Sequence, residues 1–378
     1  MYTASSTFHA AVASGNPQRI LLIFPDLVFS NEDVDINTGV EVREHFNTEK
    51  DLCIGQVLSN EIAFAIFNDY GDLNSYEFGD FTATLGVQLT DTPYTETGNC
   101  SVVYGSDTYV GRNTSPYITK NGSAMANQPS FPVKSIIVYD GVVYAIGASG
   151  QCKRWVNGSG AVYTLNQFMV RKMTRKQGCG FSYNSTTRIM KERNGTREKI
   201  YEFVPLGVFT ADRPNVPDLI RIDFTCNDQM MKLDKDMPDA TALNITYPAT
   251  VSTLFTKICQ YFGVSYTTST FINSTATISE EPEEFSYSTA RTVLGWIAEA
   301  AGSNAVFNRD GQLELRWVSS AGASMDESGY AEFRPYWYET KTIDKVLNRD
   351  TQGSEEKSHG SGNTPYLIQD NPILRGCT

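Results

Sequence analysis

Closely spaced carboxylates are the residues of this 378-residue sequence with the clearest potential for chemistry. They occur as the pairs Glu280–Glu281, Glu283–Glu284 and Asp33–Asp35. Two carboxylates about 5–9 Å apart can hydrolyse a glycosidic bond, and Asp33 and Asp35 could bind calcium if further oxygen ligands joined them. The glutamates surround Pro282, however, and this composition favours a solvated loop. We therefore expect neither a catalytic pair nor a metal site at these positions.

Other reactive groups are scarce. The three histidines, His9, His45 and His359, match no metal-binding spacing such as HExxH. The sequence contains no GxSxG nucleophile motif and no phosphate-binding P-loop. Seven widely spaced cysteines without a CxxC pair favour neither zinc nor a disulfide framework, and we expect buried thiols in a reducing cytoplasm. They are Cys53, Cys100, Cys152, Cys179, Cys226, Cys259 and Cys377. The residues alone predict no catalytic residue, no metal and no cofactor.

A local excess of positive charge lies between residues 153 and 199. Its members are Arg171, Lys172, Arg175, Lys176, Arg188, Lys191, Arg193, Arg197 and Lys199. Nucleic-acid binding is one interpretation, but aromatic residues do not alternate regularly with these charges, so a solvated or intersubunit surface is favoured. The whole chain carries a formal charge of −12, which disfavours affinity for phosphate backbones. Such a charge keeps a large protein soluble, and it would also let DNA slide along an acidic wall.

Aromatic side chains offer a second alternative function. The cluster of Phe333, Tyr336, Trp337 and Tyr338 could form a carbohydrate-binding platform, although such clusters more often belong to a core or a subunit contact. We expect Trp155 and Trp296 in the core. A carbohydrate-binding or cell-wall-degrading β-sandwich protein therefore remains the alternative to a structural protein.

The elements that would position these residues are mostly strands. Aromatic, Thr, Val and Ile residues are abundant, and Ile62, Phe64 and Ile66 alternate as in a half-buried strand. Asp140–Gly141 between two apolar runs predicts a hairpin over residues 135–146. Further strands are expected at 19–24, 27–30, 40–45, 78–89, 201–209 and 219–224, with Gly79 and Gly86 as bends or bulges.

Helices are predicted at three places. Residues 5–14 form a short helix with Phe8 and Val12 on one face, ended by a glycine and a proline. Residues 250–262 and 288–301 show apolar spacing of three and four, and Ser288 is the expected N-cap of the second of them. A hairpin over residues 304–317 completes a small α/β unit. Residues 353–362 are expected to form a polar loop, and the segment from 366 to 378 shows no closing element.

These patterns predict a mainly β chain with a small α/β domain. We expect a β-barrel domain over residues 1–239 with a β-rich insertion at about 100–180, the α/β domain at 240–317, and the start of a second barrel at 318–378. Few residues remain to finish that barrel, so either the chain is a piece of a longer protein or a partner completes it. We expect no signal peptide, since the first residues lack a basic and an apolar region, and no membrane anchor.

Several of these segments resemble the hub proteins of bacteriophage and prophage tails. The residues that carry the resemblance are Ile62–Asn68 with Glu77–Gly79, Val204–Phe209 with Asn227–Asp234, Tyr247–Val251, Thr289–Arg291, Gly302, Ala305, Asp310–Leu313, Tyr366, Ile368 and Asn371–Pro372. It covers most of residues 5–90 and 200–375, and its motifs are turns and apolar positions without a catalytic signature. The stretch 100–180 departs from it.

The resemblance implies β-barrel domains of the phage tail hub type and a structural role without enzymatic activity. It implies a homotrimer whose paired barrels form a ring that continues the tail tube at the tip or baseplate. Implied neighbours are distal tail or tube proteins, the tape measure protein, and tail fibre or tip proteins, with DNA passing through the lumen without specific binding. The protein would belong to the virion and assemble in the bacterial cytoplasm.

Overall fold

The protein is described by a computed structural model. It covers residues 4–376 apart from 26–27, 36, 45–52, 69–70, 72, 75, 150, 157–158, 163–178, 212–213, 219, 317–344 and 351–354. Two compact units divide the chain. Unit 1 comprises Met1–Val40, Phe64–Gly207 and Ala211–Phe224, and unit 2 comprises Glu41–Ala63, Val208–Thr210 and Thr225–Thr378. The domain boundaries predicted between residues 239 and 240 and between residues 317 and 318 remain predictions.

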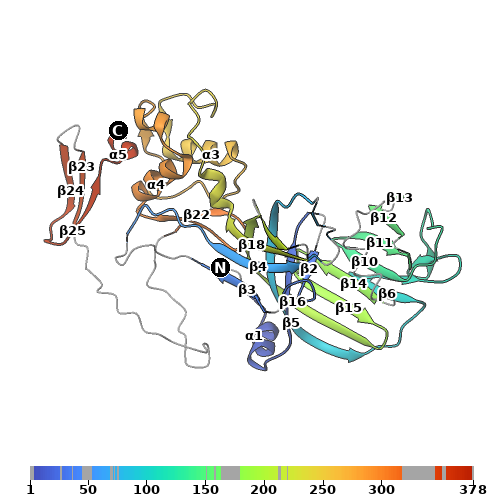
Figure 1. The fold of residues 1–378 in the computed structure, drawn as a ribbon. Helices are drawn as coiled ribbons and strands as arrows, with labels where there is room; N and C mark the ends of the chain where they lie inside the picture. The colour runs from blue at the N-terminus through green and yellow to red at the C-terminus, as the bar shows by residue number, and fades with distance from the viewer. Residues whose placement is uncertain are drawn as a thin grey trace. The chain divides into compact units, whose positions relative to one another are not determined.

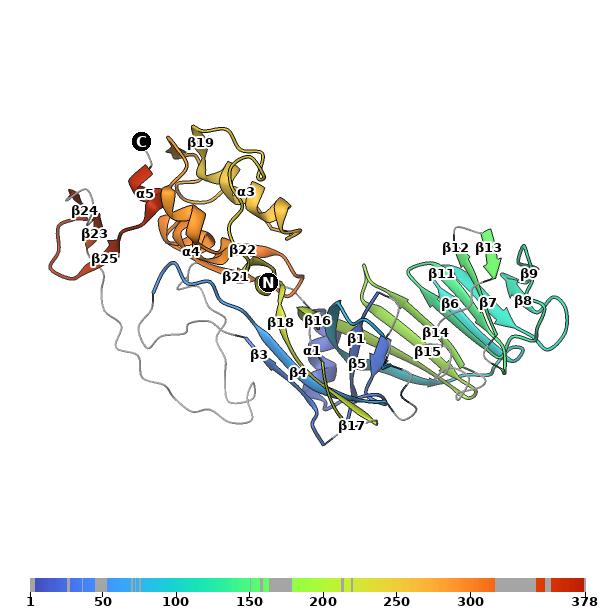
Figure 2. The same cartoon turned by 45° about the horizontal axis from the view of Figure 1, so that its top comes forward.

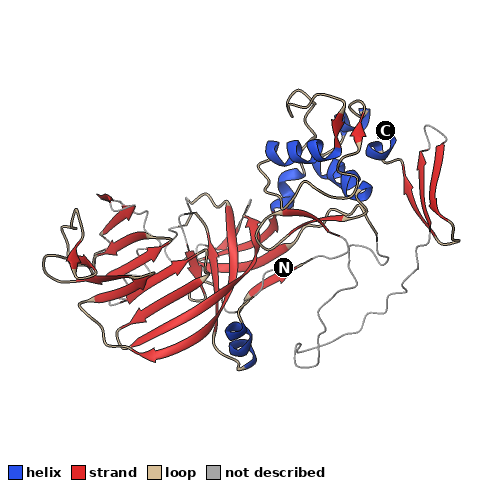
Figure 3. Cartoon of the chain, turned by 180° about the vertical axis from the view of Figure 1, so that it is seen from behind, coloured by secondary structure: helices blue, strands red, loops and turns tan. Residues whose placement is uncertain are grey.

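Strands dominate unit 1 (Figures 1 and 3). Its elements are α1 (Ser6–Ala13), β1 (Gln18–Ile23), β2 (Val28–Ser30), β5 (Asp80–Pro93), β6 (Cys100–Tyr104), β7 (Asp107–Gly111), β8 (Ile118–Lys120), β9 (Ser123–Ala124), β10 (Ser135–Tyr139), β11 (Val142–Ile146), β12 (Cys152–Val156), β13 (Ser159–Val162), β14 (Cys179–Asn184), β15 (Ile189–Asn194) and β17 (Asn215–Asp218). Strands β3 (Val40–Arg43), β4 (Glu61–Phe67), β16 (Arg197–Thr210) and β18 (Arg221–Asp228) give residues to both units.

Fourteen described strands join in one sheet, which curls into a half-barrel in unit 1 (Figure 2). Strands β2, β1, β5, β16, β15 and β14 follow one another across it, and β18 and β4 branch from β16. The inner face is aromatic: Phe64 stacks on Phe224 and Phe24 stacks on Phe81, each at 4.6 Å between ring centroids. The predicted alternation of β4 is confirmed, because Ile62, Phe64 and Ile66 are all buried.

The β-rich stretch around residues 100–156 has a core of its own. Strands β6 to β9 form a separate four-stranded sheet, and their buried side chains pack with those of β10 to β12 around Trp155. Asp140 and Gly141 both have positive φ in the hairpin between β10 and β11, as the sequence predicted. Gly86 is not a bend, since it lies within the continuous strand β5, where a Cβ atom would meet the Phe203 ring at 2.5 Å.

Unit 2 contains the small α/β part. Its elements are η1 (Gln229–Leu233), β19 (Ala249–Thr250), α3 (Val251–Tyr261), β20 (Thr277–Ile278), η2 (Glu283–Tyr287), α4 (Ala290–Ala300), β21 (Asn304–Phe307), β22 (Leu313–Arg316), β23 (Lys345–Asp350), β24 (Glu355–Gly360), β25 (Pro365–Gln369) and α5 (Pro372–Gly376). One apolar core joins α3, α4, the β21–β22 hairpin and Ile373 of α5. The prediction of a mainly β chain with a small α/β part is confirmed.

Four local predictions need correction. Thr289 rather than Ser288 caps α4, through a bond from the Thr292 amide. Val12 is 42% exposed, because the short α1 packs through Phe8 and Ala11 alone. Residues 355–360 of the expected polar loop form β24, which pairs with β23. The chain also ends in the strand β25 and the helix α5, which the sequence did not reveal.

None of the described helices is long and apolar enough to cross a membrane. The sequence also predicts strands at residues 330–338 and 340–347; residues 330–344 lie outside the described residues, whereas residues 345–347 form the start of β23.

Candidate functional site

The acidic pair Asp33 and Asp35 has a structural role in unit 1. The Asp33 carboxylate accepts a bond from the Ser30 amide at 2.8 Å. Both oxygens of Asp35 have donors: one accepts from the amide and side chain of Asn37, and the other pairs with Arg221 at 2.9 Å. These contacts occupy the Asp35 oxygens that a cation would need. Among the described residues, no group of three or more potential ligands is placed to hold a metal ion.

The glutamates around Pro282 do not converge either. Glu280 and Glu281 are exposed, whereas Glu283 and Glu284 lie in the first turn of η2. Glu284 forms an ion pair with Arg375 of α5, which ties η2 to the end of the described chain. Glu280 and Glu281 therefore face solvent, whereas Glu284 links η2 to α5.

The histidines and cysteines show no reactive arrangement among the residues whose side chains are described. His9 is exposed on α1, while His45 and the side chain of His359 lie outside the description. Cys100, Cys152, Cys226 and Cys259 are buried, as predicted, whereas Cys53 is only partly buried. Burial raises the pKa of Cys152, Cys226 and Cys259 to about 12, so these thiols remain protonated and unreactive near neutral pH.

Two arginines in the described part of the basic cluster pair with acids. Arg193 of β15 pairs with Glu198 of β16 at 2.5 Å, and its guanidinium lies 4.1 Å from the centre of the Tyr94 ring. Arg197 pairs with Asp91 at 2.7 Å. Arg197 is exposed, as expected of a solvated surface, and the alternative of an intersubunit surface stays a prediction. Arg171, Lys172, Arg175 and Lys176, like the aromatic cluster at 333–338, lie outside the described residues.

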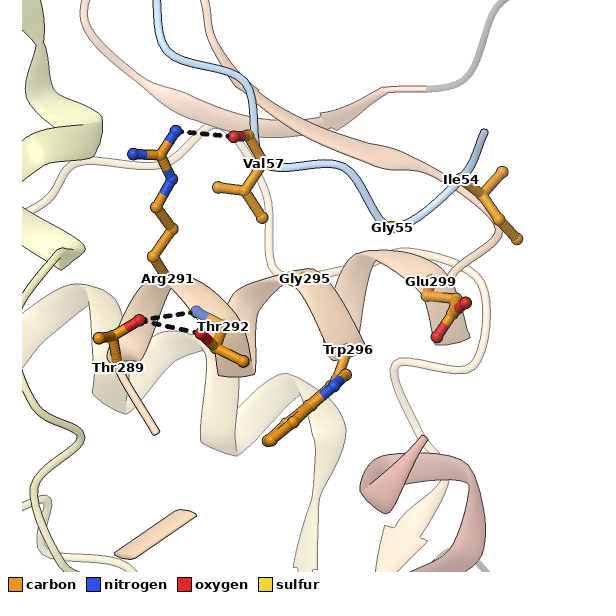
Figure 4. Close-up of a pocket in the computed structure, with 9 residues that line it drawn as sticks. All are labelled: Ile54, Gly55, Val57, Thr289, Arg291, Thr292, Gly295, Trp296 and Glu299. Carbon is orange, nitrogen blue, oxygen red and sulfur yellow. Dashed lines mark hydrogen bonds between the residues drawn. The ribbon is translucent and has the colours of Figure 1, made fainter. Parts of the chain in front are cut away.

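A groove in unit 2 runs along the outer face of α4 (Figure 4). It has a volume of about 370 Å³. Its floor is the helix face that carries Thr292, Gly295, Trp296 and Glu299, positions that share one side because of the helical repeat. The segment from Ile54 to Val57 forms its other wall.

Two glycines let this wall approach the helix closely. A Cβ atom on Gly295 would lie 3.1 Å from the Gly55 carbonyl oxygen, and one on Gly55 would lie 2.8 Å from the Glu299 Cβ. Gly55 also has φ of +80°, which other residues rarely adopt. The wall is held in place by the Gly55 amide, which donates to the Ser303 carbonyl at 2.8 Å, and by a bridge between Val57 and Ala305.

Arg291 closes one end of the groove. Its guanidinium donates to the Val57 carbonyl at 2.9 Å and pairs with Asp234 at 3.1 Å. Nearby, the buried Asp228 accepts bonds from Ser59, from the Asn60 amide and from the Met230 amide. Burial raises the Asp228 pKa in spite of these donors. The Arg291 guanidinium is thus already bound within the protein, by the Val57 carbonyl and by Asp234.

Glu299 lies at the other end and is the acidic residue of the groove. One of its oxygens accepts from the Asn371 side chain at 2.8 Å. Burial raises the pKa of Glu299, and the bond from Asn371 partly opposes that rise. Trp296, predicted as a core residue, is only half-buried: it lines the groove and stacks on Phe285 with ring centroids 6.2 Å apart.

Neither a family model nor a curated protein matches the chain. A solved structure, the 43 kDa tail protein of prophage MuSo2 from Shewanella oneidensis, resembles it with a TM-score of 0.33. The identity is 10%, over 95% of this chain and 76% of that chain.

The groove has no direct signature in the sequence. Its walls come from positions separated by more than two hundred residues, and none of Gly55, Gly295 and Glu299 belongs to a recognisable motif. The available signal was Gly295 in the middle of a predicted helix, where glycine costs roughly 1 kcal/mol relative to alanine and usually has a packing reason.

Proposed function

We propose that this chain is a structural subunit of a bacteriophage tail, a hub protein whose trimer forms a ring that continues the tail tube. The observation that carries the proposal is the order of its parts: a curled β-sheet, a helix–helix–hairpin unit and a three-stranded sheet follow one another in one chain. This is the order that the resemblance to tail hubs implies.

The residues of that resemblance hold positions that shape the backbone or the core. In unit 1, Phe64 lies at the centre of the aromatic inner face, 5.6 Å from the Phe81 ring as well as stacked on Phe224. In unit 2, Thr250 caps α3 by accepting from the Thr253 amide at 3.1 Å. These residues stabilise the fold and do not form a reactive site, as expected for a structural subunit.

The turns of unit 2 support the same interpretation. Gly302 follows α4 with φ of +63°, the left-handed conformation that ends a helix. Gly311, in the turn between β21 and β22, has φ of +73°, and a Cβ atom there would lie 2.6 Å from the Val208 side chain. Only glycine combines this backbone conformation with so close a contact.

A half-barrel with open edges also suits self-association. Among the described strands, β2 pairs with β1 alone, so one of its edges has no strand partner. Open sheet edges are usually covered by another element or another chain. In the proposed ring, copies of the chain would supply that cover, and the acidic net charge of −12 would line a conduit that DNA crosses without specific binding.

In a tail, the neighbours of this ring would be distal tail or tube proteins, the tape measure protein, and fibre or tip proteins. The ring would form in the bacterial cytoplasm and remain in the virion at the tail tip or baseplate. An obligate ring of this kind should bury more than about 2,000 Å² per interface.

Light scattering coupled to size exclusion tests the proposal on the full chain at micromolar concentration. We expect the mass of three chains, and electron micrographs of the same fraction should show particles with three-fold symmetry and a central opening. A monomer that persists over a hundredfold range of concentration, with no ring in the micrographs, would overturn the trimeric hub.

A further inference from the structure

The groove along α4 presents an acidic group that the protein leaves only partly satisfied. Glu299 receives one hydrogen bond, from Asn371 to a single carboxylate oxygen. The cation that lines the groove, Arg291, is bound to Asp234 and to the Val57 carbonyl at the opposite end. The half-buried carboxylate therefore lacks a positive partner among the residues that form the groove.

An aromatic surface lies one helical turn away from this carboxylate. Trp296 and Glu299 are spaced by three residues on α4, so both side chains border the same groove. Trp296 is backed by Phe285, which stacks on it almost in parallel, at an interplanar angle of 13°. A supported indole beside a carboxylate suits a long cationic side chain, whose stem packs on the ring while its head meets the negative charge.

The dimensions suit a small group such as a single side chain. A volume of about 370 Å³ is near the lower end for pockets that hold small ligands. Gly55 and Gly295 let the wall rest directly against the helix, so the space that remains is a shallow groove open to solvent. An extended arginine or lysine side chain fits both the shape and the charge.

We propose that this groove is a docking site for an arginine or lysine side chain on an exposed segment of another protein, with Glu299 as the charge partner and Trp296 as the apolar platform. The charge complementarity of Glu299 carries the choice of partner. The inference rests on unit 2 alone, so it holds or fails independently of the proposed ring.

The test uses the full chain and a short acetylated peptide amide, Gly-Ser-Arg-Ser-Gly, observed by ligand-detected NMR. The same peptide with citrulline in place of arginine is the neutral control. We expect weak binding of the arginine peptide, with Kd on the order of 1 mM for so small a ligand, and at least about tenfold weaker binding of the citrulline peptide.

Two matched variants separate the groove from general attraction to an acidic protein. Glu299→Gln removes the charge but keeps an acceptor for Asn371, whereas Glu280→Gln removes the same charge from an exposed site outside the groove. We expect about a tenfold loss of affinity for the first and less than a twofold change for the second. Trp296→Phe should weaken binding to an intermediate degree, since phenylalanine is the poorer cation–π partner.

Three outcomes would overturn the proposal. One is equal binding of both peptides, and another is an equal effect of Glu299→Gln and Glu280→Gln, which would mean non-specific electrostatics. The third is that Glu299→Gln abolishes self-association of the chain, which would assign the groove to a second copy. Thermal denaturation of each variant shows that a loss of binding does not reflect unfolding.

Discussion

Removal of the Asn371 side chain should release α5 from α4. This side chain is 2% exposed and makes four hydrogen bonds. Its amide group donates to the Trp296 carbonyl at 3.0 Å and to Glu299 at 2.8 Å, and its oxygen accepts from the amides of Ile373 and Leu374 at 2.9 and 3.2 Å. Each bond contributes about 0.5–1.5 kcal/mol net, and the pairs that share one atom do not add fully.

We therefore expect Asn371→Ala to cost about 2–4 kcal/mol in the local stability of the α4–α5 contact. Hydrogen exchange measured by mass spectrometry reports local opening even in a chain of two units, where a single unfolding energy is poorly defined. Amides of residues 373–375 should exchange roughly 30- to 900-fold faster than in the unmodified protein.

Asn371→Asp is the sharper comparison. The new carboxylate keeps the acceptor for Ile373 and Leu374 but faces Glu299 and the Trp296 carbonyl without a proton to donate. At neutral pH it should destabilise the contact at least as much as alanine, because two like charges share a half-buried site. Acidification should restore much of the loss, since one proton held between the carboxyl groups replaces the missing donor. Exchange within threefold of the unmodified protein for both variants would refute this account of α5.

Three further predictions concern the core, a close contact and a titration. Phe64→Ala should lower the stability of unit 1 by about 3–5 kcal/mol, seen as a lower urea midpoint, because a fully buried ring leaves a cavity beside Phe224. Gly180→Ala places a Cβ atom 1.7 Å from the Ser101 carbonyl oxygen, so β14 must move away from β6 and limited proteolysis should cut residues 100–156 sooner. Glu299→Gln should be as stable as the unmodified protein below pH 4.5, where the Glu299 carboxyl group is protonated. As the pH rises through the elevated folded-state pKa of Glu299, the variant should become the more stable protein, because ionised Glu299 destabilises the folded state. A difference that does not change with pH would contradict the last of these.

The elements that could be predicted from the sequence are those with local causes. The spacing of Leu254, Phe255 and Ile258 is enough to define the buried face of α3, and all three are buried. The hairpin at Asp140–Gly141 depends on two residues that tolerate positive φ. In such cases the information lies within a few residues of the element, so no tertiary contact has to be known.

Elements with non-local causes were missed. The sequence of β24, EEKSHG, has little strand preference, and it becomes a strand by pairing with β23. The helix α5 has only five residues and is held by Asn371 and by the burial of Ile373 in the core of unit 2. Neither cause is visible without the fold, because the partners come from other segments of the chain.

A local cause also explains the structural role of the acidic pair Asp33 and Asp35. Neighbouring carboxylates in a loop are well placed to accept bonds from nearby amides, as Asp35 does from Asn37. Residues two apart in a loop therefore tend to satisfy the backbone before they can serve a ligand.

What the α4 groove can do follows from a count of its charges. Hydrolysis of a glycosidic bond requires a second carboxylate about 5–9 Å from the first, and Glu299 is the one acidic side chain among the residues that line the groove. Its raised pKa would suit proton donation, but a lone acid beside a supported indole lacks the base or nucleophile that such a reaction needs. A single partly desolvated carboxylate next to an aromatic face can still discriminate a cation from its neutral isostere, because the charge is matched only when the cation is present. The charges of the groove therefore favour the proposed recognition of a positively charged side chain.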